Sequence, residues 1–330
     1  MRDILEHLFS HHTLQRHEAC EILKNMAAQQ YNQSQMASFL TVFRMRSITV
    51  EELEGFRDAM LDLCRPIALD AFNPIDLCGT GGDGKDTFNI STLAAFVVAG
   101  CGIPVAKHGN YGVSSLCGSS NVLQELGIKF SNDESLLHRQ MEEAGLCYLH
   151  APLFHPAMKH IAPVRRELRA RTFFNMLGPL VNPSFPKQQL VGVFSLELAR
   201  LYGYLLQRKD VRYRIVHSLD GYDEVSLTGK FKLISESGEQ LVAPEDWGLP
   251  TVLPEQLYGG ETVASAAQLF LKVLNGEGTQ VQNDVVLTNA SLAVHCARPG
   301  TSIEDARAAA SESLVSGKAR QVLERLTQIS

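Results

Sequence analysis

Residues 76–92 are Asp-Leu-Cys-Gly-Thr-Gly-Gly-Asp-Gly-Lys-Asp-Thr-Phe-Asn-Ile-Ser-Thr, a glycine-rich loop between a short apolar run and the start of a helix. The apolar run Ile75–Cys78 has the length and character of the end of a buried strand. Four glycines follow within six residues, and glycine adopts positive φ and lets backbone N–H groups approach an anion. Strand, glycine loop and helix N-terminus together predict an anion-binding site.

A glycine-rich surface turn is the alternative interpretation of the same stretch. Asp83 and Asp86 inside the loop argue against it. Carboxylates beside a phosphate pocket indicate that a cation or a sugar hydroxyl is bound there as well.

Composition narrows the class of protein. The chain has 330 residues, 45% hydrophobic and 20% charged, which is typical of a soluble globular enzyme with one large or two smaller domains. A net charge of −6 argues against a general nucleic-acid binder. Seven cysteines without a C-x-x-C pair indicate free thiols in a reducing cytoplasm. We expect neither a signal peptide nor a membrane span, because no apolar run is suitable for either.

The pattern of apolar residues predicts helices alone over residues 1–65, with caps at Asn32 and Thr49. Beyond Ile75, short apolar strands alternate with helices, which predicts a largely parallel sheet covered by helices. The expected strands are Ile75–Cys78, Val105–Lys107, Cys147–Leu149, Leu190–Phe194, Tyr213–His217 and Glu224–Leu227, and the expected helices between them include 89–100, 119–126 and 133–144.

Three further segments complete this outline. Residues 151–187, with six prolines and a basic helix, predict an insertion that returns to the helical region. Lys230–Val242 predicts a polar hairpin, and the last 70 residues predict helices.

A second polar loop follows the strand at Val105. Lys107, His108 and Asn110 stand at the carboxyl end of this strand, where open α/β sheets bind ligands. The serines that follow, with the lysine and free N–H groups, could hold a second phosphate. Alone this would be a flexible loop, but two such loops in one sheet suggest a ligand with phosphate at both ends.

Two charged segments add candidate ligands. Arg165 belongs to a basic helix that could be a solvated face, but an arginine can also bind the carboxylate of a small acidic substrate bidentately. Asp223 and Glu224 are adjacent, and beside a polyphosphate pocket they are better interpreted as Mg²⁺ ligands than as surface acidity. The sequence has no G-x-x-x-x-G-K-[ST] and no G-x-S-x-G, which excludes a P-loop and a serine nucleophile elbow.

Five motifs occur along nearly the whole chain: Gly79-Thr-Gly-Gly-Asp83, Asn89-x-Ser-Thr92, Lys107-His-Gly-Asn110, Arg171-Thr-x-Phe-Asn-x-Leu-Gly-Pro-Leu-x-Asn-Pro183 and Asp223-Glu224. In this combination and order the sequence resembles the anthranilate phosphoribosyltransferase family. The resemblance implies an α/β protein of the nucleoside phosphorylase/phosphoribosyltransferase class, with a small α-helical domain and a large α/β domain around a central, mostly parallel sheet. Residues 1–70, with part of 161–190, would form the helical domain of a homodimer, and 71–160 with 191–330 the α/β domain.

The resemblance also implies the reaction. The phosphoribosyl group of 5-phospho-α-D-ribose 1-diphosphate (PRPP) would pass to the amine of anthranilate, with Mg²⁺ as cofactor. The products would be N-(5-phosphoribosyl)anthranilate and diphosphate, in tryptophan biosynthesis.

The site residues carried over from the family fall into four sets. Lys107 and Asp83 would be catalytic. PRPP would contact Gly79, Gly82, Asp83, Thr87, Asn89, Ile90, Ser91, Thr92, Lys107, Ser115 and Ser119. Anthranilate would contact Gly79, His108, Asn110, His155, Arg165 and Gly178. Ser91, Asp223 and Glu224 would hold the metal. The sequence departs from the family's usual residues at Tyr111, Cys117 and Ser120-Asn121, which affects details of the diphosphate loop and not the reaction.

Two alternatives remain open. A pyrimidine nucleoside phosphorylase has a similar fold but should lack the pair Asp223-Glu224 and the segment Arg171-Thr-Phe-Phe-Asn. A non-catalytic paralogue that binds nucleic acid predicts degraded motifs and a basic surface. The intact motifs and the acidic balance favour the transferase.

Overall fold

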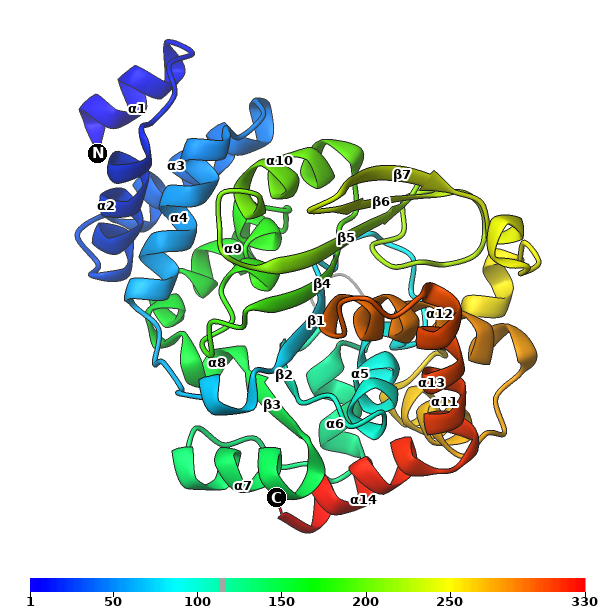
Figure 1. The fold of residues 1–330 in the computed structure, drawn as a ribbon. Coiled ribbons are helices and arrows are strands. Elements are labelled where there is room, and N and C mark those ends of the chain that lie inside the picture. The colour runs from blue at the N-terminus through cyan, green and yellow to red at the C-terminus, as the bar shows by residue number, and fades with distance from the viewer. Residues whose placement is uncertain (113–116, 330) are drawn as a thin grey trace.

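The computed structural model describes residues 1–112 and 117–329. Four N-terminal helices lie beside a larger body in which helices surround a sheet (Figure 1). Among the described residues, no helix is long and apolar enough to cross a membrane.

The N-terminal helices are α1 (Arg2–Phe9), α2 (Arg16–Ala27), α3 (Gln33–Met45) and α4 (Val50–Asp62). Side-chain caps start two of them where the sequence predicts. The Asn32 side chain accepts the N–H of Gln35, and the Thr49 hydroxyl accepts the N–H of Glu52. In each helix the side chain of the third helical residue in turn accepts the backbone N–H of the cap residue, which completes a capping box. These two helix starts are therefore confirmed.

A cluster of phenylalanines joins this helical part to a segment far along the chain. Phe39 and Phe43 of α3 meet Phe56 of α4, and all three contact Phe173. The rings of Phe56 and Phe173 stack with centroids 4.1 Å apart. Burial of each such ring stabilises the fold by about 1.5–3 kcal/mol. The proline-rich segment therefore does return to the helical part.

The sheet has the strand order β3-β2-β1-β4-β5-β6-β7. The first five strands in this order run parallel, and β6 and β7 form an antiparallel hairpin at one edge. The expected mostly parallel sheet and the hairpin are confirmed. The strands are β1 (Ile75–Gly79), β2 (Val105–Gly109), β3 (Leu146–His150), β4 (Gln188–Gly192), β5 (Arg212–Ser218), β6 (Phe231–Ser235) and β7 (Gly238–Val242).

One expected strand is wrong. Glu224–Leu227 forms an irregular loop, and the place beside β5 is taken by β6. The apolar residues Val225 and Leu227 are fully buried, which explains the strand-like pattern. Their backbone is not extended throughout, since Leu227 has φ 60°, and the N–H of Val225 bonds to the Asn289 side chain.

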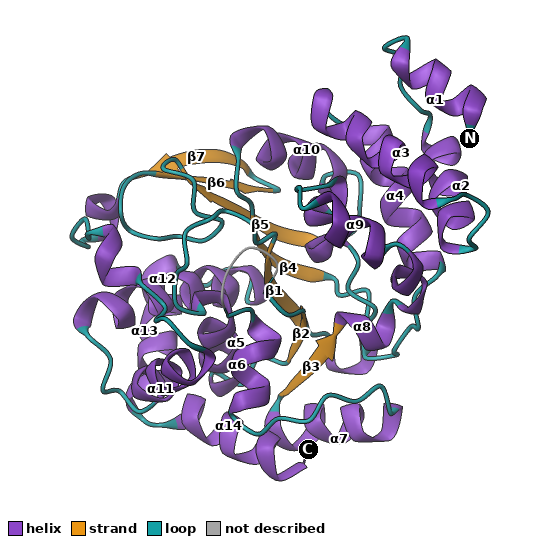
Figure 2. Ribbon diagram, turned by 180° about the vertical axis from the view of Figure 1, so that it is seen from behind, coloured by secondary structure: helices purple, strands orange, loops and turns teal. Residues whose placement is uncertain are grey.

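Helices cover both faces of the sheet (Figure 2). Successive strand residues point to opposite faces, so Leu190 and Val216 join the core under α5 and α12, whereas Val191 and Ile215 join the core shared with the N-terminal helices. The helices that follow β1 are α5 (Ile90–Gly100), α6 (Ser119–Glu125), α7 (Glu134–Ala144), α8 (Ala151–Phe154), α9 (Ala162–Leu168), α10 (Leu196–Leu206), α11 (Val263–Leu274), α12 (Gln280–Ala297), α13 (Ile303–Val315) and α14 (Lys318–Ile329).

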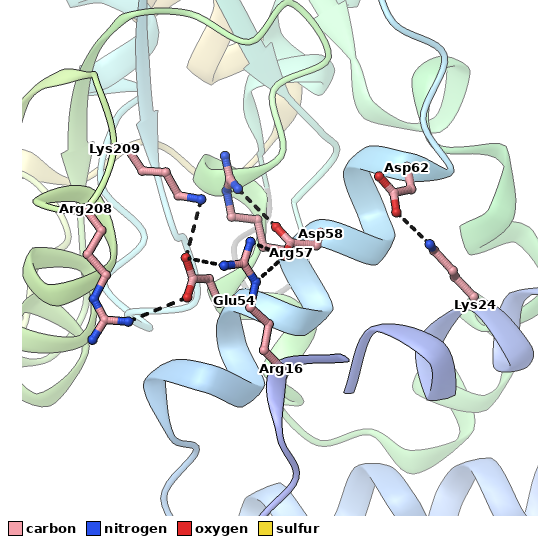
Figure 3. A network of polar contacts seen from close by, with 8 residues as sticks. All are labelled: Arg16, Lys24, Glu54, Arg57, Asp58, Asp62, Arg208 and Lys209. Carbon is pink, nitrogen blue, oxygen red and sulfur yellow. Dashed lines mark hydrogen bonds and ion pairs between the residues drawn. The ribbon is translucent and has the colours of Figure 1, made fainter. Parts of the chain in front are cut away.

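A network of charges connects α2 and α4 to the turn after α10 (Figure 3). The buried carboxylate of Glu54 lies 3.4 Å from Arg16 and 3.4 Å from Lys209, and 3.8 Å from Arg208. Because Lys209 and Arg208 belong to the α/β body, this one carboxylate pairs with cations from both parts of the molecule.

Candidate active site

A cavity of about 270 Å³ opens at the carboxyl ends of β1 and β2. The carboxyl ends of parallel strands meet at one edge of a sheet, which is the usual ligand site of open α/β folds. Most of the residues expected at the site line it: Gly79, Gly82, Asp83, Thr87, Asn89, Ser91, Thr92, Lys107, His108, Asn110, Ser119, Arg165, Gly178, Asp223 and Glu224.

Two of the expected residues that the structure describes are not part of this lining, and Ser115 lies outside the described residues. The side chain of Ile90 is fully buried in the core, because this apolar residue begins α5 on its inner side. His155 lies behind His108, with ring centroids 5.3 Å apart.

The glycine loop brings backbone donors to the cavity. Gly81 and Gly82 have φ values of 64° and 75°, which favour glycine. Gly79 is required for a different reason, because a Cβ there would lie 2.5 Å from Oδ2 of Asp223. The same oxygen accepts the N–H of Gly81 at 2.6 Å. The loop is thus folded around the Asp223 carboxylate.

The start of α5 forms the next wall. The side-chain amide of Asn89 donates to the carbonyl of Cys117 at 3.1 Å, and the N–H of Ser91 donates to Oε1 of Glu224 at 2.8 Å. A helix N-terminus attracts an anion, and here it holds the Glu224 carboxylate.

Two carboxylates therefore face one cavity, with Asp223 buried and Glu224 half-buried. Burial, with Asp83 nearby, raises the pKa of Asp223 to about 7. Burial and the neighbouring Asp223 raise the pKa of Glu224 well above its usual range. Among the described residues, neither carboxylate forms an ion pair.

This donor set suits Mg²⁺. A divalent cation would offset the adjacent negative charges, and Mg²⁺ takes few protein carboxylates and fills its remaining positions with water and phosphate oxygens. Within the described part of the chain, no three His, Cys, Asp or Glu side chains are arranged to hold a metal by themselves. The pair would therefore hold Mg²⁺ together with a ligand that supplies oxygens.

Two cationic side chains from different elements line the cavity. Lys107 of β2 is buried, and its ammonium donates to the carbonyl of Leu77 on β1. Arg165 of α9 lies on the side of the helical part, with its guanidinium carbon 4.9 Å from the ring centre of Phe174. Burial lowers the pKa of Arg165 to about 10, so the side chain stays charged at neutral pH.

His108 presents a neutral imidazole in this lining. Burial lowers its pKa to about 3. Its Nδ1 lies 3.0 Å from the carbonyl of Gly178 and must carry the proton to donate there, which leaves the buried Nε2 as a free acceptor. The backbone N–H of His108 donates to the buried carboxylate of Asp76 at 3.2 Å.

The structure adds lining residues to which the sequence analysis assigned no contact with a substrate or metal. Most are neighbours of expected ones within the glycine and serine loops, and Phe174 and Asn175 belong to the segment after Arg171. Ala151 follows β3, so the rule of strand carboxyl ends could have found it. The additional residues are Cys78, Thr80, Gly81, Asp86, Phe88, Gly109, Tyr111, Gly112, Cys117, Gly118, Ala151, Phe174 and Asn175. Burial raises the pKa of the Cys78 thiol far above its usual range, which makes it unsuitable as a nucleophile.

Two family models match the chain in succession. Residues 2–64 match "Glycosyl transferase family, helical bundle domain", and residues 72–320 match "Glycosyl transferase family, a/b domain". The anthranilate phosphoribosyltransferase of Flavobacterium psychrophilum is 57% identical over 330 residues, which is 100% of both chains. That of Bacteroides fragilis YCH46 is 51% identical over the same length.

Solved structures with the same name share the fold. The enzyme of Thermus thermophilus has a TM-score of 0.91 and 35% sequence identity, covering 98% of each chain. The Saccharomyces cerevisiae enzyme in complex with PRPP and Mg has a TM-score of 0.90 and 26% identity, covering 98% of this chain and 96% of its own. A complex of the yeast enzyme with 4-fluoroanthranilate has a TM-score of 0.88 and 25% identity, covering 98% of this chain and 96% of that one.

Proposed function

Since the chain belongs to the anthranilate phosphoribosyltransferase family, we propose that this cavity transfers the phosphoribosyl group of PRPP to the amine of anthranilate. The products are N-(5-phosphoribosyl)anthranilate and diphosphate, which is a step of tryptophan biosynthesis. The observation that carries the proposal is the meeting, in one cavity, of a glycine loop, a helix N-terminus, an adjacent carboxylate pair and an arginine.

PRPP binds along the loop and the start of α5. The backbone donors between Gly79 and Thr92 suit its phosphate oxygens, and Ser119 at the start of α6 suits a second phosphate. Asp223, Glu224 and Ser91 hold Mg²⁺, which neutralises the negative charge of the diphosphate. The raised pKa values of the two carboxylates support this, because a cation would stabilise their ionised forms.

Anthranilate binds at the side of the cavity formed by α9 and the end of β2. Arg165 suits its carboxylate, since a guanidinium donates two parallel hydrogen bonds. His108, Asn110 and Gly178 complete this wall. His155, behind His108, supports the histidine from the second layer.

In the reaction, the anthranilate amine attacks C1 of the ribose while diphosphate leaves, and the configuration at C1 inverts. An aromatic amine is neutral at physiological pH, so the attack needs no strong base. Arg165 and the wall around it position the amine, which is an entropic contribution to catalysis. Lys107 and the loop N–H groups stabilise the departing diphosphate, and Asp83 orients the ribose or a metal-bound water.

We also propose the larger organisation of the protein. The helical domain comprises residues 1–70 with part of 161–190, and the shared core of Ile161, Val164 and Phe173 with the N-terminal helices supports this. Residues 71–160 and 191–330 form the α/β domain. A homodimer forms through the helical domain, where Phe9 and Met45 are exposed, and sedimentation of the protein tests it. The cysteines of the described residues are all free, which supports a cytoplasmic location.

Anthranilate fluorescence tests the function. Loss of signal that requires both PRPP and Mg²⁺, and that EDTA stops, supports the transferase. Phosphorolysis of thymidine or uridine without this loss would instead indicate a pyrimidine nucleoside phosphorylase, and inactivity in both assays a nucleic-acid-binding paralogue. Asp223→Asn is expected to lower turnover and weaken the dependence on Mg²⁺, and unchanged kinetics would remove Asp223 from the metal site.

A further inference from the structure

Arg171 lies against the glycine loop, although it has no role in the site described above. It precedes the 3-10 helix Phe173–Met176, between α9 and β4. A Cβ built on Gly82 would lie 3.9 Å from Nε of Arg171, and one on Gly84 would lie 3.7 Å from its Nη2. The guanidinium therefore rests at van der Waals distance above the two glycines that flank Asp83.

The position of this guanidinium is supported from two sides. Its central carbon lies 5.5 Å from the ring centre of Phe194, which follows β4. The next residue, Thr172, donates its N–H to the side chain of Asn175 at 3.1 Å, and Asn175 lines the cavity. The backbone beside Arg171 is thus anchored to the cavity wall.

Arg171 has no acidic partner among the described residues, although Asp83 lies between the two glycines that it covers. Its side chain is exposed. A guanidinium carries five N–H donors that match the oxygens of a phosphate. These donors are available to a ligand on the glycine loop.

Among the charged side chains that line the cavity, carboxylates outnumber cations. Asp83, Asp86, Asp223 and Glu224 face two cationic side chains there, Lys107 and Arg165. A ligand with several phosphate charges would be repelled by this surplus of carboxylates unless cations at the rim oppose it. Arg171 is placed to do so.

We propose that Arg171 is a further substrate-binding residue, whose guanidinium binds phosphate oxygens of PRPP above Gly82 and Gly84. This rests on the proposed function, because it takes PRPP as the ligand. The phosphate oxygens belong either to the diphosphate or to the 5-phosphate of the ribose, and the two sources can be separated by inhibition.

Lys85 offers a matched control on the same loop. Its ammonium lies 4.5 Å from the ring centre of Tyr222, and a Cβ on Gly221 would lie 3.6 Å from its Cε. It has the same charge and a similar aromatic support, and neither it nor Arg171 is among the residues that line the cavity. Its ammonium, however, is held against Tyr222 and Gly221, whereas Arg171 lies over Gly82 and Gly84. Lys85→Met therefore measures what the loss of any positive charge near the loop does.

The experiment compares the wild-type protein with Arg171→Met, Arg171→Lys and Lys85→Met in the anthranilate fluorescence assay. Arg171→Met is expected to raise the KM for PRPP about tenfold and to leave kcat and the KM for anthranilate within about twofold, because a contact made equally in ground and transition states changes KM alone. Arg171→Lys should lie between, since it keeps the charge without the planar fork. Lys85→Met should match the wild type.

Inhibition by inorganic diphosphate and by ribose 5-phosphate identifies the phosphate. The inhibitor whose Ki rises with the KM in Arg171→Met carries the oxygens that Arg171 binds. The KM for PRPP should also depend less on ionic strength in this variant, since one charged contact is gone. If Arg171→Met does not fold, Arg171→Lys gives the same comparison with a smaller change.

An unchanged KM for PRPP in Arg171→Met, in a protein whose wild type is active, would overturn this inference and leave the proposed function intact. An equal rise in Arg171→Met and Lys85→Met would overturn it too, because it would show a general effect of charge. A wild type that consumes no anthranilate would overturn the proposed function and this inference together.

Discussion

Gly79→Ala is a sensitive test of how the site is built. The new methyl carbon would lie 2.5 Å from Oδ2 of Asp223 and 3.2 Å from its carboxyl carbon. An unstrained contact needs about 3.5 Å, so one of the two groups must move by about 1 Å. The backbone of Gly79 is paired with Gly192 of β4, and a Cβ on Gly192 would overlap the backbone oxygen of Asp223. The Asp223 side chain is therefore the part that moves.

This displacement should remove the hydrogen bond from Gly81 to Asp223 and misplace one Mg²⁺ ligand. A misplacement of about 1 Å in an active site can cost about 100-fold in rate, and we expect a loss of this size in kcat/KM. The Mg²⁺ concentration for half-maximal rate should rise about tenfold, which corresponds to about 1.4 kcal/mol. The assay is anthranilate fluorescence over a titration with Mg²⁺, with Gly229→Ala, which meets no atom within 4 Å, as control.

A double-mutant cycle isolates the cause. Asp223→Ala removes the carboxylate that the methyl group displaces, so adding Gly79→Ala to it should cost little more. Fully additive losses, or a Gly79→Ala variant with the wild-type Mg²⁺ titration, would refute the reasoning.

Three other changes test separate parts of the molecule. Glu54→Gln should lower the free energy of unfolding by about 1–3 kcal/mol, because three partly hydrated cations lose their buried partner. Urea unfolding measures this change, and the control Glu51→Gln, at an exposed residue, should leave the free energy of unfolding unchanged. The pKa of His108 is lowered to about 3, below that of the unfolded chain, so its contribution to stability is present above about pH 6.5 and is lost as the pH falls. His108→Gln should thus flatten the decline of stability below pH 6.5 by up to about 1.4 kcal/mol per pH unit, and parallel curves would contradict this. Arg165→Ala should raise the KM for anthranilate about tenfold while the KM for PRPP stays within about twofold, and an unchanged KM for anthranilate would remove the assignment.

Local features of this protein could be predicted from the sequence because they depend on neighbouring residues. Glycine at positions 81 and 82 predicts positive φ there. Asn32 and Thr49 predict helix starts, because each stands three residues before a side chain that can complete its capping box. The alternation of apolar strands and helices indicates a parallel sheet, and such a sheet places its strand ends, and hence the binding loops, at one edge.

Contacts between distant segments were decided only by the tertiary structure. The N–H of Gly81 meets a carboxylate 142 positions away, and Phe173 stacks in a core of helices that end before residue 65. Val225 is apolar and buried as a strand residue would be, yet its N–H donates to the side chain of Asn289 in α12 and not to a neighbouring strand. His155 was expected at the cavity and lies one layer behind it. Such placements depend on how whole helices and strands pack against one another. Burial and shape complementarity between two elements produce no recognisable pattern of residues in the sequence of either one.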